Sequence, residues 1–245
     1  MIGTEPEIPS GNMGHAVLLN ISKAAGLNQW MFESIRPYVK GRILEVGSGI
    51  GNISAIFVRR KIPLFLSDFK EEYCRVLKKN FDGQPEVGGI FQIDLADKDF
   101  DVNCAGLLGT FDTVFALNVV EHIKDDSLAV KNCYKLLAPG GHLILLMPAY
   151  RALYNRFDEE LGHCRRYARS TINRLLSNDF EVLKIWYFNL AGIFGWWFFG
   201  SVLRRKIISK RQMDIYEKLI LLFRFADWLT LRRVGLSVIG VGRKK

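Results

Sequence analysis

The feature that most constrains the fold of this chain is a glycine-rich turn between a short apolar run and a helical pattern. The stretch covers residues 42–54 and reads RILEVGSGIGNIS. Its glycines Gly47, Gly49 and Gly51 alternate, so the backbone can adopt positive φ angles and no side chain blocks a ligand. The free N–H groups at the start of the next helix then face that ligand. A buried strand, this turn and a helix together predict a nucleotide-like ligand.

The spacing of the glycines indicates which nucleotide-like ligand fits. The dinucleotide fingerprint needs glycine at its sixth position, where this chain has Asn52. An acid, Glu45, stands two residues before the first glycine and can accept hydrogen bonds from a cationic or hydroxylated group. This E-x-G-x-G-x-G order resembles motif I of the class I S-adenosylmethionine-dependent methyltransferases, whose acid helps hold the methionine end of the cofactor. The resemblance implies S-adenosyl-L-methionine as cofactor, bound by Glu45, Gly47, Ser48, Gly49 and Gly51; the alternative is a tight turn without a ligand.

Apolar strand patterns alternate with helical patterns along the rest of the chain. The expected strands after the first are 63–67, 89–95, 111–117, 142–148, 180–188 and 234–243, and the helices between them include 53–60, 70–80, 125–137 and 170–176. Strands that alternate with helices and are apolar on both faces predict a parallel sheet covered on both sides.

The resemblance to the methyltransferases covers residues 42–148. FDTVFALNVVEHI (111–123) and LLAPGGHLILLMP (136–148) look like motifs IV to VI of the small-molecule members. This implies a doubly wound, Rossmann-like α/β fold with a seven-stranded sheet of order 3-2-1-4-5-7-6, its seventh strand antiparallel. It also implies that Asn118 and Val119 line the path to the sulfonium and that Glu121 and His122 lie close to the cofactor. For His122, an equal alternative is that it only holds its loop.

Two acids at strand ends are further cofactor candidates. Asp68 lies 23 residues after Glu45, near the offset at which an acid meets ribose hydroxyls, with Phe69 beside it. The segment from Asp68 to Glu71 is also a capping-box pattern, which would make Asp68 a helix N-cap. In the resembling family an acid at the position of Asp94, next to Leu95, binds the adenine amino group; the alternative is an ordinary turn aspartate.

The segment 149–167 concentrates groups that transfer protons and bind anions. Its P-A-x-x-A-L-Y and G-H-x-R-R-Y elements resemble a bacterial subgroup of these methyltransferases with unassigned substrates. We expect His163, as a base, and Tyr150 to be catalytic. Adjacent arginines suit phosphate or carboxylate, so we expect the acceptor to meet Tyr154, Arg165, Arg166 and Tyr167. The alternative is that the arginines pair with Asp158, Glu159 or Glu160.

The positive charge of the chain is concentrated near its C-terminal end. From residue 188 onward there are twelve Lys and Arg against three acids, a balance equal to the net charge of +9 of the whole chain. Within residues 189–233 an aromatic run, IFGWWFFG, precedes clustered Lys and Arg. The 14 residues from Leu190 to Leu203 lack charge, fewer than the roughly 20 that span a bilayer. Two interpretations stay open: a helix that lies on an anionic membrane surface, and a lid or dimer flap whose aromatics are buried.

These patterns divide the chain into four parts. We expect an N-terminal arm with helices (1–40), a methyltransferase core (41–188), a basic aromatic helical insertion (189–233) and the last core strand (234–245). Residues 1–14 lack a signal-peptide pattern. The four cysteines are scattered without a C-x-x-C pair, so we expect neither disulfides nor a metal site, and a reducing, cytoplasmic location with contact at the inner membrane.

The function expected from the resemblance is methyl transfer from S-adenosylmethionine to a small or amphipathic molecule, including a lipid-like or lipid-linked one. The reaction is a direct displacement in which the enzyme aligns the reacting groups. One alternative is a nucleic-acid methyltransferase that uses the basic segment on phosphates, but the chain has Asn118-Val119-Val120-Glu121 where such enzymes carry N/D-P-P-Y/F. A non-catalytic scaffold that retains the fold is the other alternative.

Overall fold

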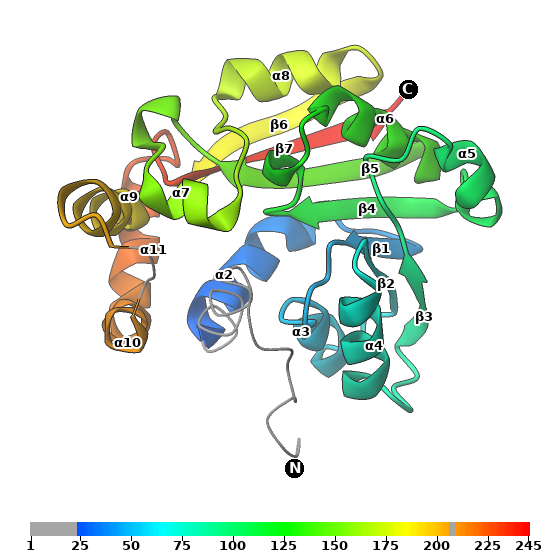
Figure 1. Cartoon of the computed structure of the whole chain (residues 1–245), viewed down its shortest axis with the longest axis horizontal. Helices are drawn as coiled ribbons and strands as arrows, with labels where there is room; N and C mark the ends of the chain where they lie inside the picture. Colours follow the sequence, from blue (N-terminus) through cyan, green and yellow to red (C-terminus); the bar gives the residue numbers. More distant parts are fainter. Residues whose placement is uncertain (1–23, 206–208) are drawn as a thin grey trace.

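The structure, a computed structural model, describes residues 24–205 and 209–245 (Figure 1). The expected N-terminal arm therefore lies outside the described residues, as does the first part of the expected helical region before residue 40. The described chain forms one twisted sheet with helices on both faces, and a further group of helices at one end of the sheet (Figure 1).

The sheet has seven strands in the order β3-β2-β1-β4-β5-β7-β6. Only β7 runs antiparallel to its neighbours. This confirms the predicted fold class and strand order. The strands are β1 (Ile43–Val46), β2 (Leu64–Asp68), β3 (Val87–Gln92), β4 (Phe111–Leu117), β5 (Leu137–Pro148), β6 (Phe180–Phe188) and β7 (Ser237–Lys244).

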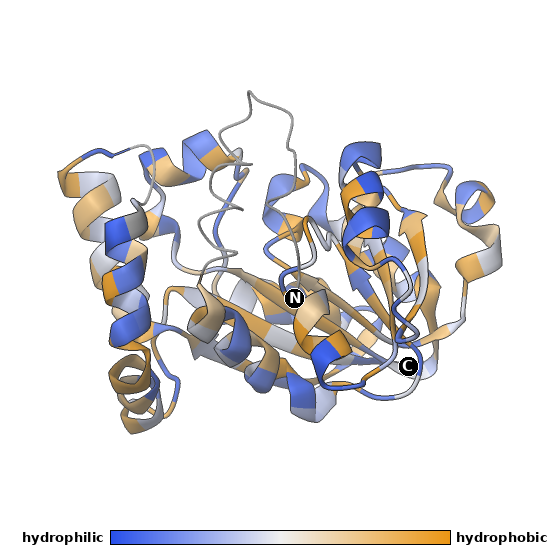
Figure 2. Cartoon of the chain, turned by 90° about the horizontal axis from the view of Figure 1, so that it is seen from below, coloured by the Kyte–Doolittle hydropathy of each residue, from blue (hydrophilic) through white to orange (hydrophobic). Residues whose placement is uncertain are grey.

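The helices divide between the two faces of the sheet. On one face lie α2 (Ala25–Ile35), α3 (Ser54–Arg59) and α4 (Glu71–Asn80); on the other lie α5 (Phe100–Asn103), α6 (Asp126–Leu136) and α8 (Arg169–Ser177). Short 3₁₀ turns are η1 (Arg36–Tyr38), η2 (Ala105–Leu107), η3 (Val120–His122) and η4 (Arg151–Leu153). Side chains alternate between the faces of a strand, so Leu44 and Val46 pack toward α5, α6 and α8, whereas Ile43 packs toward α2 and α3. Figure 2 shows the hydrophobic strands at the centre of the molecule.

Several boundaries differ from the expected ones. β5 starts at Leu137 and not at His142, because the segment Pro139-Gly140-Gly141 forms a bulge in the strand and not a free turn. The pairing with β4 shifts there, and Gly140 has a φ of +72°, a conformation that glycine adopts without strain. β7 starts at Ser237, three residues after the expected start.

The helices of the predicted insertion lie between β6 and β7, at the end of the sheet where the parallel strands finish (Figure 1). They are α9 (Leu190–Trp196), a π-helical turn η5 (Trp197–Val202), α10 (Lys210–Lys218) and α11 (Ile220–Leu229). Glu217 fastens α10 to the body, since its carboxylate accepts hydrogen bonds from the N–H groups of Gly26 and Leu27 at 2.6 and 3.0 Å. A carboxylate at a helix N-terminus satisfies free N–H groups and the helix dipole.

Candidate active site

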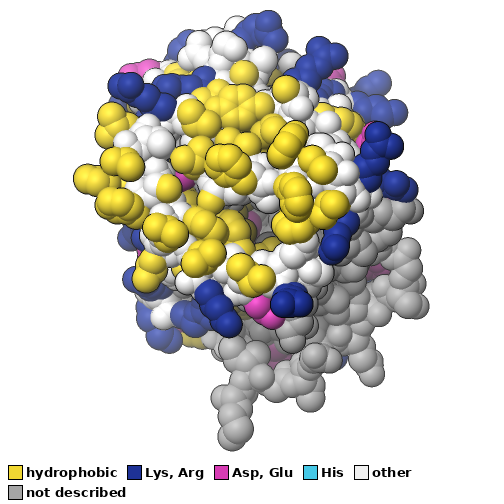
Figure 3. Space-filling model, turned by 90° about the vertical axis from the view of Figure 1, so that its left-hand side faces the viewer, with side chains coloured by type: hydrophobic (Ala, Val, Ile, Leu, Met, Phe, Trp, Pro, Cys, Tyr) yellow, Lys and Arg dark blue, Asp and Glu magenta, His cyan; other side chains and the backbone are white. Residues whose placement is uncertain are grey.

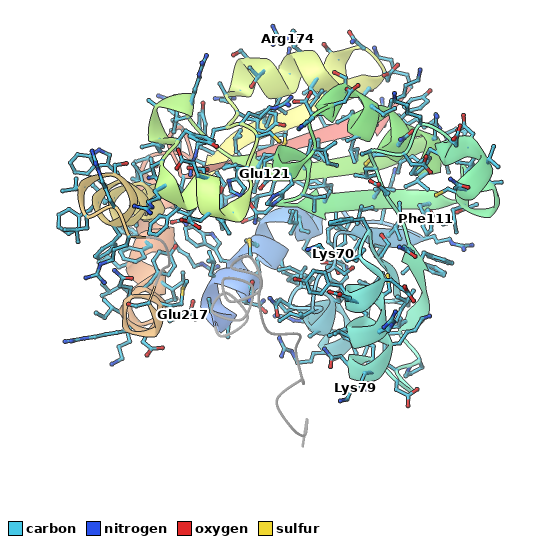
Figure 4. All side chains as sticks on the ribbon, viewed as in Figure 1. Lys70, Lys79, Phe111, Glu121, Arg174 and Glu217 are labelled. Carbon is cyan, nitrogen blue, oxygen red and sulfur yellow. The ribbon has the colours of Figure 1, made fainter. Side chains whose placement is uncertain are left out.

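The predicted cofactor residues meet at the carboxyl ends of β1, β2 and β4. β1 lies between β2 and β4, so the crossovers leave β1 in opposite directions and open a crevice beside it, which is where open α/β sheets bind ligands. Figure 4 shows Glu121 at this edge, near the end of β4 and beside α7 (Arg156–Leu161).

The glycine turn leaves no room for side chains. Gly47 has a φ of +73°, and a Cβ there would lie 2.4 Å from Cγ2 of Val119. Gly51 has a φ of +89°, and a Cβ there would lie 2.3 Å from the ring of Phe81. The N–H of Ser48 donates to the carbonyl of Ser67 at 2.8 Å, which fastens the turn to β2. The turn is therefore a compact backbone loop without bulky side chains, and the N–H groups of Ser48, Gly49 and Gly51 are held within the protein.

Glu45 is buried under this turn, with 4% of its surface exposed. Ser54, at the start of α3, donates its hydroxyl to Oε2 of Glu45. Burial raises the pKa of Glu45 to about 7, and hydrogen bonds from Ser54 and Ser48 limit the rise. A carboxyl in this state gains charge when a cation or a hydroxyl donor arrives. Ser54 was not predicted as a site residue, although it stands at the first helical position after the turn.

Asp68 connects β2 to the glycine turn. Its Oδ2 accepts from the N–H of Gly49 at 3.0 Å, and its Oδ1 accepts from the N–H of Lys70 at 3.0 Å. Lys70, and not Asp68, holds the N-cap position of α4, so the capping interpretation is wrong. Burial raises the pKa of Asp68. Phe69, beside it, exposes 57% of its surface; the ribose contact of Asp68 stays a prediction.

The other predicted cofactor residues lie in loops at the same edge. β3 ends before Asp94, whose Oδ1 accepts from the N–H of Ala96 at 2.8 Å, as in an ordinary turn. Leu95 is buried. Asn118 has a φ of +56° and donates its N–H to the carbonyl of Leu146 at 2.8 Å, which turns the chain so that Val119 covers Gly47. Their contacts with adenine and the sulfonium stay predictions.

Asp158 organises the segment after β5; the sequence named it only as one of three acids that could pair with the arginines. Its side chain is fully buried. Oδ1 lies 2.8 Å from Nδ1 of His163 and accepts from Nε of Arg166 at 2.9 Å, while Oδ2 accepts from Nε1 of Trp196 at 3.3 Å. Burial alone would raise the pKa of Asp158, but the hydrogen bond from His163 and the charge of Arg166 lower it. Asp158 is therefore a buried carboxylate that orients the His163 ring.

The arginines and Tyr167 use their polar groups within the protein. Arg166 also donates to the carbonyl of Ala149 at 2.9 Å. Arg165 pairs with Asp126 at 2.8 Å, and the Tyr167 hydroxyl donates to the same carboxylate at 3.0 Å. These pairs favour the structural interpretation of the arginines, with Asp158 and Asp126 as partners; acceptor binding by these residues stays a prediction.

The two tyrosines at the start of the segment differ in environment. Tyr150 has a φ of +60° and stacks on Tyr187, with ring centroids 4.9 Å apart. Burial, followed by the proximity of Tyr187, raises the pKa of Tyr150 to about 12, so this phenol suits proton donation or hydrogen bonding and not the role of a base. The Tyr154 hydroxyl donates to the carbonyl of His163 at 2.9 Å.

Comparisons with known proteins agree with this geometry. Residues 44–143 match a family model described as a methyltransferase domain. Over 104 residues the chain is 31% identical to the ubiquinone biosynthesis O-methyltransferase of Xanthomonas euvesicatoria, a match covering 42% of this chain and 41% of that protein. Over 140 residues it is 27% identical to probable polyketide synthase 40 of Dictyostelium discoideum, covering 49% of this chain and 6% of that protein. The matched part thus spans about two fifths or less of these curated relatives.

Solved structures share the fold over most of the chain. A S-adenosylmethionine-dependent methyltransferase from Archaeoglobus fulgidus superposes with a TM-score of 0.58 at 15% identity, covering 90% of this chain and 94% of the other. A phosphoethanolamine N-methyltransferase from Haemonchus contortus, in complex with S-adenosylmethionine, has a TM-score of 0.57 at 14% identity and covers 89% and 52%. Residues 44–143 thus match a methyltransferase domain, and the chain has the fold of the class I S-adenosylmethionine-dependent methyltransferases, whose cofactor is S-adenosylmethionine.

Proposed function

We propose that this protein transfers the methyl group of S-adenosylmethionine to a small amphipathic acceptor that it meets at an anionic membrane surface. The observation that carries methyl transfer is the combination of the family match with Glu45 and Asp68 on either side of a glycine turn that excludes side chains. The fold alone does not decide the reaction, because the [4+2]-cyclase SpnF superposes with a TM-score of 0.60 at 15% identity, covering 98% of this chain and 99% of that one.

Methyl transfer from a sulfonium is a direct displacement, so the main task of the protein is alignment of the two reactants. Val119 covers the glycine turn at the expected position of the sulfonium. Where the acceptor must lose a proton, our candidate for the base is His163, because Asp158 fixes its ring and leaves one nitrogen for the acceptor.

The acceptor class is inferred from an exposed apolar surface on the insertion, which we call the apolar face. Figure 3 shows a broad hydrophobic area with Lys and Arg around its edge. Trp228 exposes 65% and Leu221 75% of their surfaces. The exposed hydrophobic residues of the face are Phe194, Trp197, Phe198, Val202, Leu203, Leu219, Leu221, Leu222, Phe225, Trp228, Leu229 and Leu231. Large exposed apolar areas mark surfaces that bind protein or membrane.

The charge around the apolar face favours an anionic membrane as the occupant. Arg204, Arg205, Arg211, Arg232 and Arg233 are exposed in the same part of the chain. Each cation near an anionic leaflet contributes about 1 kcal/mol of attraction, and apolar side chains beside cations are typical of elements that lie in the interface. Within the described residues, no helix is both long and apolar enough to cross a membrane.

Some residues of the aromatic run are buried, as the lid interpretation expects, and others are exposed, as the membrane interpretation expects. Trp196 turns inward, donates to Asp158 and packs on Phe157 with ring centroids 5.1 Å apart. Trp197 and Phe198 turn outward and belong to the apolar face. The insertion is therefore suited both to cover the crevice and to touch lipid, which supports an acceptor that reaches the crevice from the membrane.

Two experiments test the proposal. S-adenosylmethionine and S-adenosylhomocysteine should raise the melting temperature, because a ligand of the native state alone stabilises it by mass action, whereas NAD should not. A protein that calorimetry shows to bind NAD and not S-adenosylhomocysteine would contradict methyl transfer.

Vesicle co-sedimentation tests the membrane contact. Binding should require anionic lipid, weaken with salt, and fall in Trp197→Ser and Trp228→Ser. The matched control is Val102→Ser on α5, which removes an exposed apolar side chain outside the apolar face and should leave binding unchanged. Equal binding to neutral and anionic vesicles, or equal loss in all three variants, would reject the membrane interpretation.

A further inference from the structure

Glu121, on η3 directly after β4, is a buried carboxyl without a hydrogen-bond partner. None of its surface is exposed, and neither of its side-chain oxygens has a partner among the described residues. Burying a carboxyl in this way is costly. An unsatisfied buried group in a native structure therefore needs an explanation, and an ion that binds there is one of the standard explanations.

Two imidazoles lie beside this carboxyl. His122 follows Glu121 in the chain, and His163 comes from the segment between α7 and α8. The two segments are held together by the N–H of Cys164, which donates to the carbonyl of Glu121 at 2.7 Å. The His122 and His163 rings are 4.8 Å apart between centroids, at 76° to each other.

The donor atoms of these three side chains are close enough to share one ion. One donor atom from each of Glu121, His122 and His163 lies within 4.8 Å of the other two. Around a metal with bonds of about 2.1 Å, tetrahedral donor atoms lie roughly 3.4 Å apart, so the three donor atoms must move closer together when an ion binds. In this structure His122 also makes hydrogen bonds to the backbone of Gly162 and Leu161, which an ion at this site would have to replace.

Asp158 adds a second, independent element of a metal site. Metal-binding histidines almost always direct their other ring nitrogen to a carboxylate or a carbonyl, which fixes the ring and its tautomer. Nδ1 of His163 is held by Asp158 in this way at 2.8 Å, so Nε2 is the nitrogen that remains for a ligand. Arg166 in turn holds Asp158.

We propose that Glu121, His122 and His163 bind a divalent transition-metal ion beside the cofactor crevice. Two imidazoles and one carboxylate favour ions such as Zn²⁺, Co²⁺, Ni²⁺ or Fe²⁺ over Mg²⁺ and Ca²⁺, which prefer oxygen ligands alone. Three protein ligands leave at least one open position, as in catalytic metal sites. The sequence led us to expect no metal, because that expectation considered the spacing of cysteines and not a histidine about forty residues away from the E-H pair.

The proposed ligands are close in the chain to the expected path of the methyl group. Val119, two residues before Glu121, lies against the glycine turn. A hydroxyl of the acceptor that binds the ion there would lose its proton more readily. With the ion bound, His163 would be a ligand and not a free base; the ion would lower the pKa of the acceptor hydroxyl, and its proton would pass to solvent water.

Metal binding can be measured without cofactor or acceptor. The protein is purified with a chelator, freed of it and titrated with Co²⁺ while visible absorption is recorded, and bound metal is counted by elemental analysis. We expect one equivalent per chain. Glu121→Gln and His122→Ala should each weaken Co²⁺ binding at least tenfold, and Asp158→Asn, as a positioning residue, by 10- to 100-fold.

The matched control is His142→Ala, because this histidine lies at the start of the core portion of β5, with Nδ1 2.7 Å from the carbonyl of Tyr38. It should bind Co²⁺ as the wild type does. Far-UV circular dichroism and the melting temperature of each variant report whether it is folded, and Glu121→Gln, which keeps shape and size, is the variant on which the conclusion rests. No Co²⁺ binding by folded wild type, or equal affinity in Glu121→Gln and wild type, would overturn the site. If wild-type protein binds Co²⁺ but does not bind S-adenosylhomocysteine, the proposed function is overturned and the metal site is not.

Discussion

Raising the pH from 5 to 8 should destabilise the cofactor-free protein through Glu45. Burial raises the folded-state pKa of this carboxyl from 4.5 to about 7. Below pH 4.5 the group is protonated in both the folded and the unfolded chain. Between pH 4.5 and 7 the folded state holds a proton that the unfolded state has lost, so the free energy of unfolding falls as the pH rises, and it levels off above pH 7.

The size of the effect follows from the same two values. One pKa unit corresponds to about 1.36 kcal/mol, so the complete loss is about 3 kcal/mol, of which roughly 2.5 kcal/mol falls between pH 5 and pH 8. Because Glu45 is almost fully buried, little of this is reduced by solvent. Saturating S-adenosylhomocysteine should shrink the loss, since a cation or hydroxyl donor at Glu45 favours the ionised carboxylate.

The assay is urea unfolding, followed by tryptophan fluorescence at pH 5, 6, 7 and 8 in the presence of a chelator. Burial also raises the pKa of Glu121, to about 8, so the informative quantity is the difference between wild type and Glu45→Gln in the same buffers. That difference should change by roughly 2.5 kcal/mol in favour of the variant as the pH rises. Parallel stability curves for the two proteins would refute a raised pKa at Glu45.

Three further substitutions have distinct expected outcomes. Asp68→Ala leaves the N–H of Gly49 without its acceptor and should weaken S-adenosylhomocysteine binding by a few kcal/mol, measured by calorimetry. An unchanged dissociation constant would contradict a role of Asp68 at the cofactor. Gly51→Ala should lower stability by about 2–4 kcal/mol in denaturant titrations, because its Cβ meets Phe81, whereas Gly83→Ala, at a similar φ of +68° with open space around it, should lose only about 1–2 kcal/mol. Asp227→Ala removes the carboxylate that accepts from the N–H groups of Asn189 and Leu190, each at 2.7 Å, and should expose the start of α9 to hydrogen exchange. Full protection there would contradict this anchor.

The parallel sheet and the cofactor edge could be predicted from local signals, whereas the strand order came from the resemblance to known methyltransferases. Alternation of apolar strands with helices, the glycine turn and the resemblance to known methyltransferases each pointed to the same sheet. Glu45 and Asp68 were found because acids at the ends of parallel strands reach one edge whatever the details of packing.

The Asp158 centre could not be predicted because sequence spacing does not distinguish neighbouring acids. Asp158, Glu159 and Glu160 are equally close to the arginines in the chain, and only the direction of α7 decides that Asp158 points inward. The same limit applies to Glu121 and His163, which lie about forty residues apart and meet only in the folded chain.

The exposed surface of α11 was missed for a different reason. Leu221, Leu222, Phe225, Trp228 and Leu229 recur at helical spacing, a pattern that usually marks the side of a helix packed against a core. Periodicity reports that a helix has an apolar side, but not whether another layer covers it. In the described part of the chain, no element covers this side of α11.

The two ends of the insertion lie side by side, because Phe188 and Ser237 are paired residues on the adjacent strands β6 and β7. The residues between Phe188 and Ser237 form one long insertion in the connection of a β-hairpin. Since its ends are already neighbours, changing its length alters the entropy of the chain only slightly, and the seven strands keep their pairing. The insertion can therefore be exchanged for another segment, provided that the new segment replaces the contacts with α2. Such an exchange would change the surface on which the protein works and leave the strands at the cofactor edge unaltered.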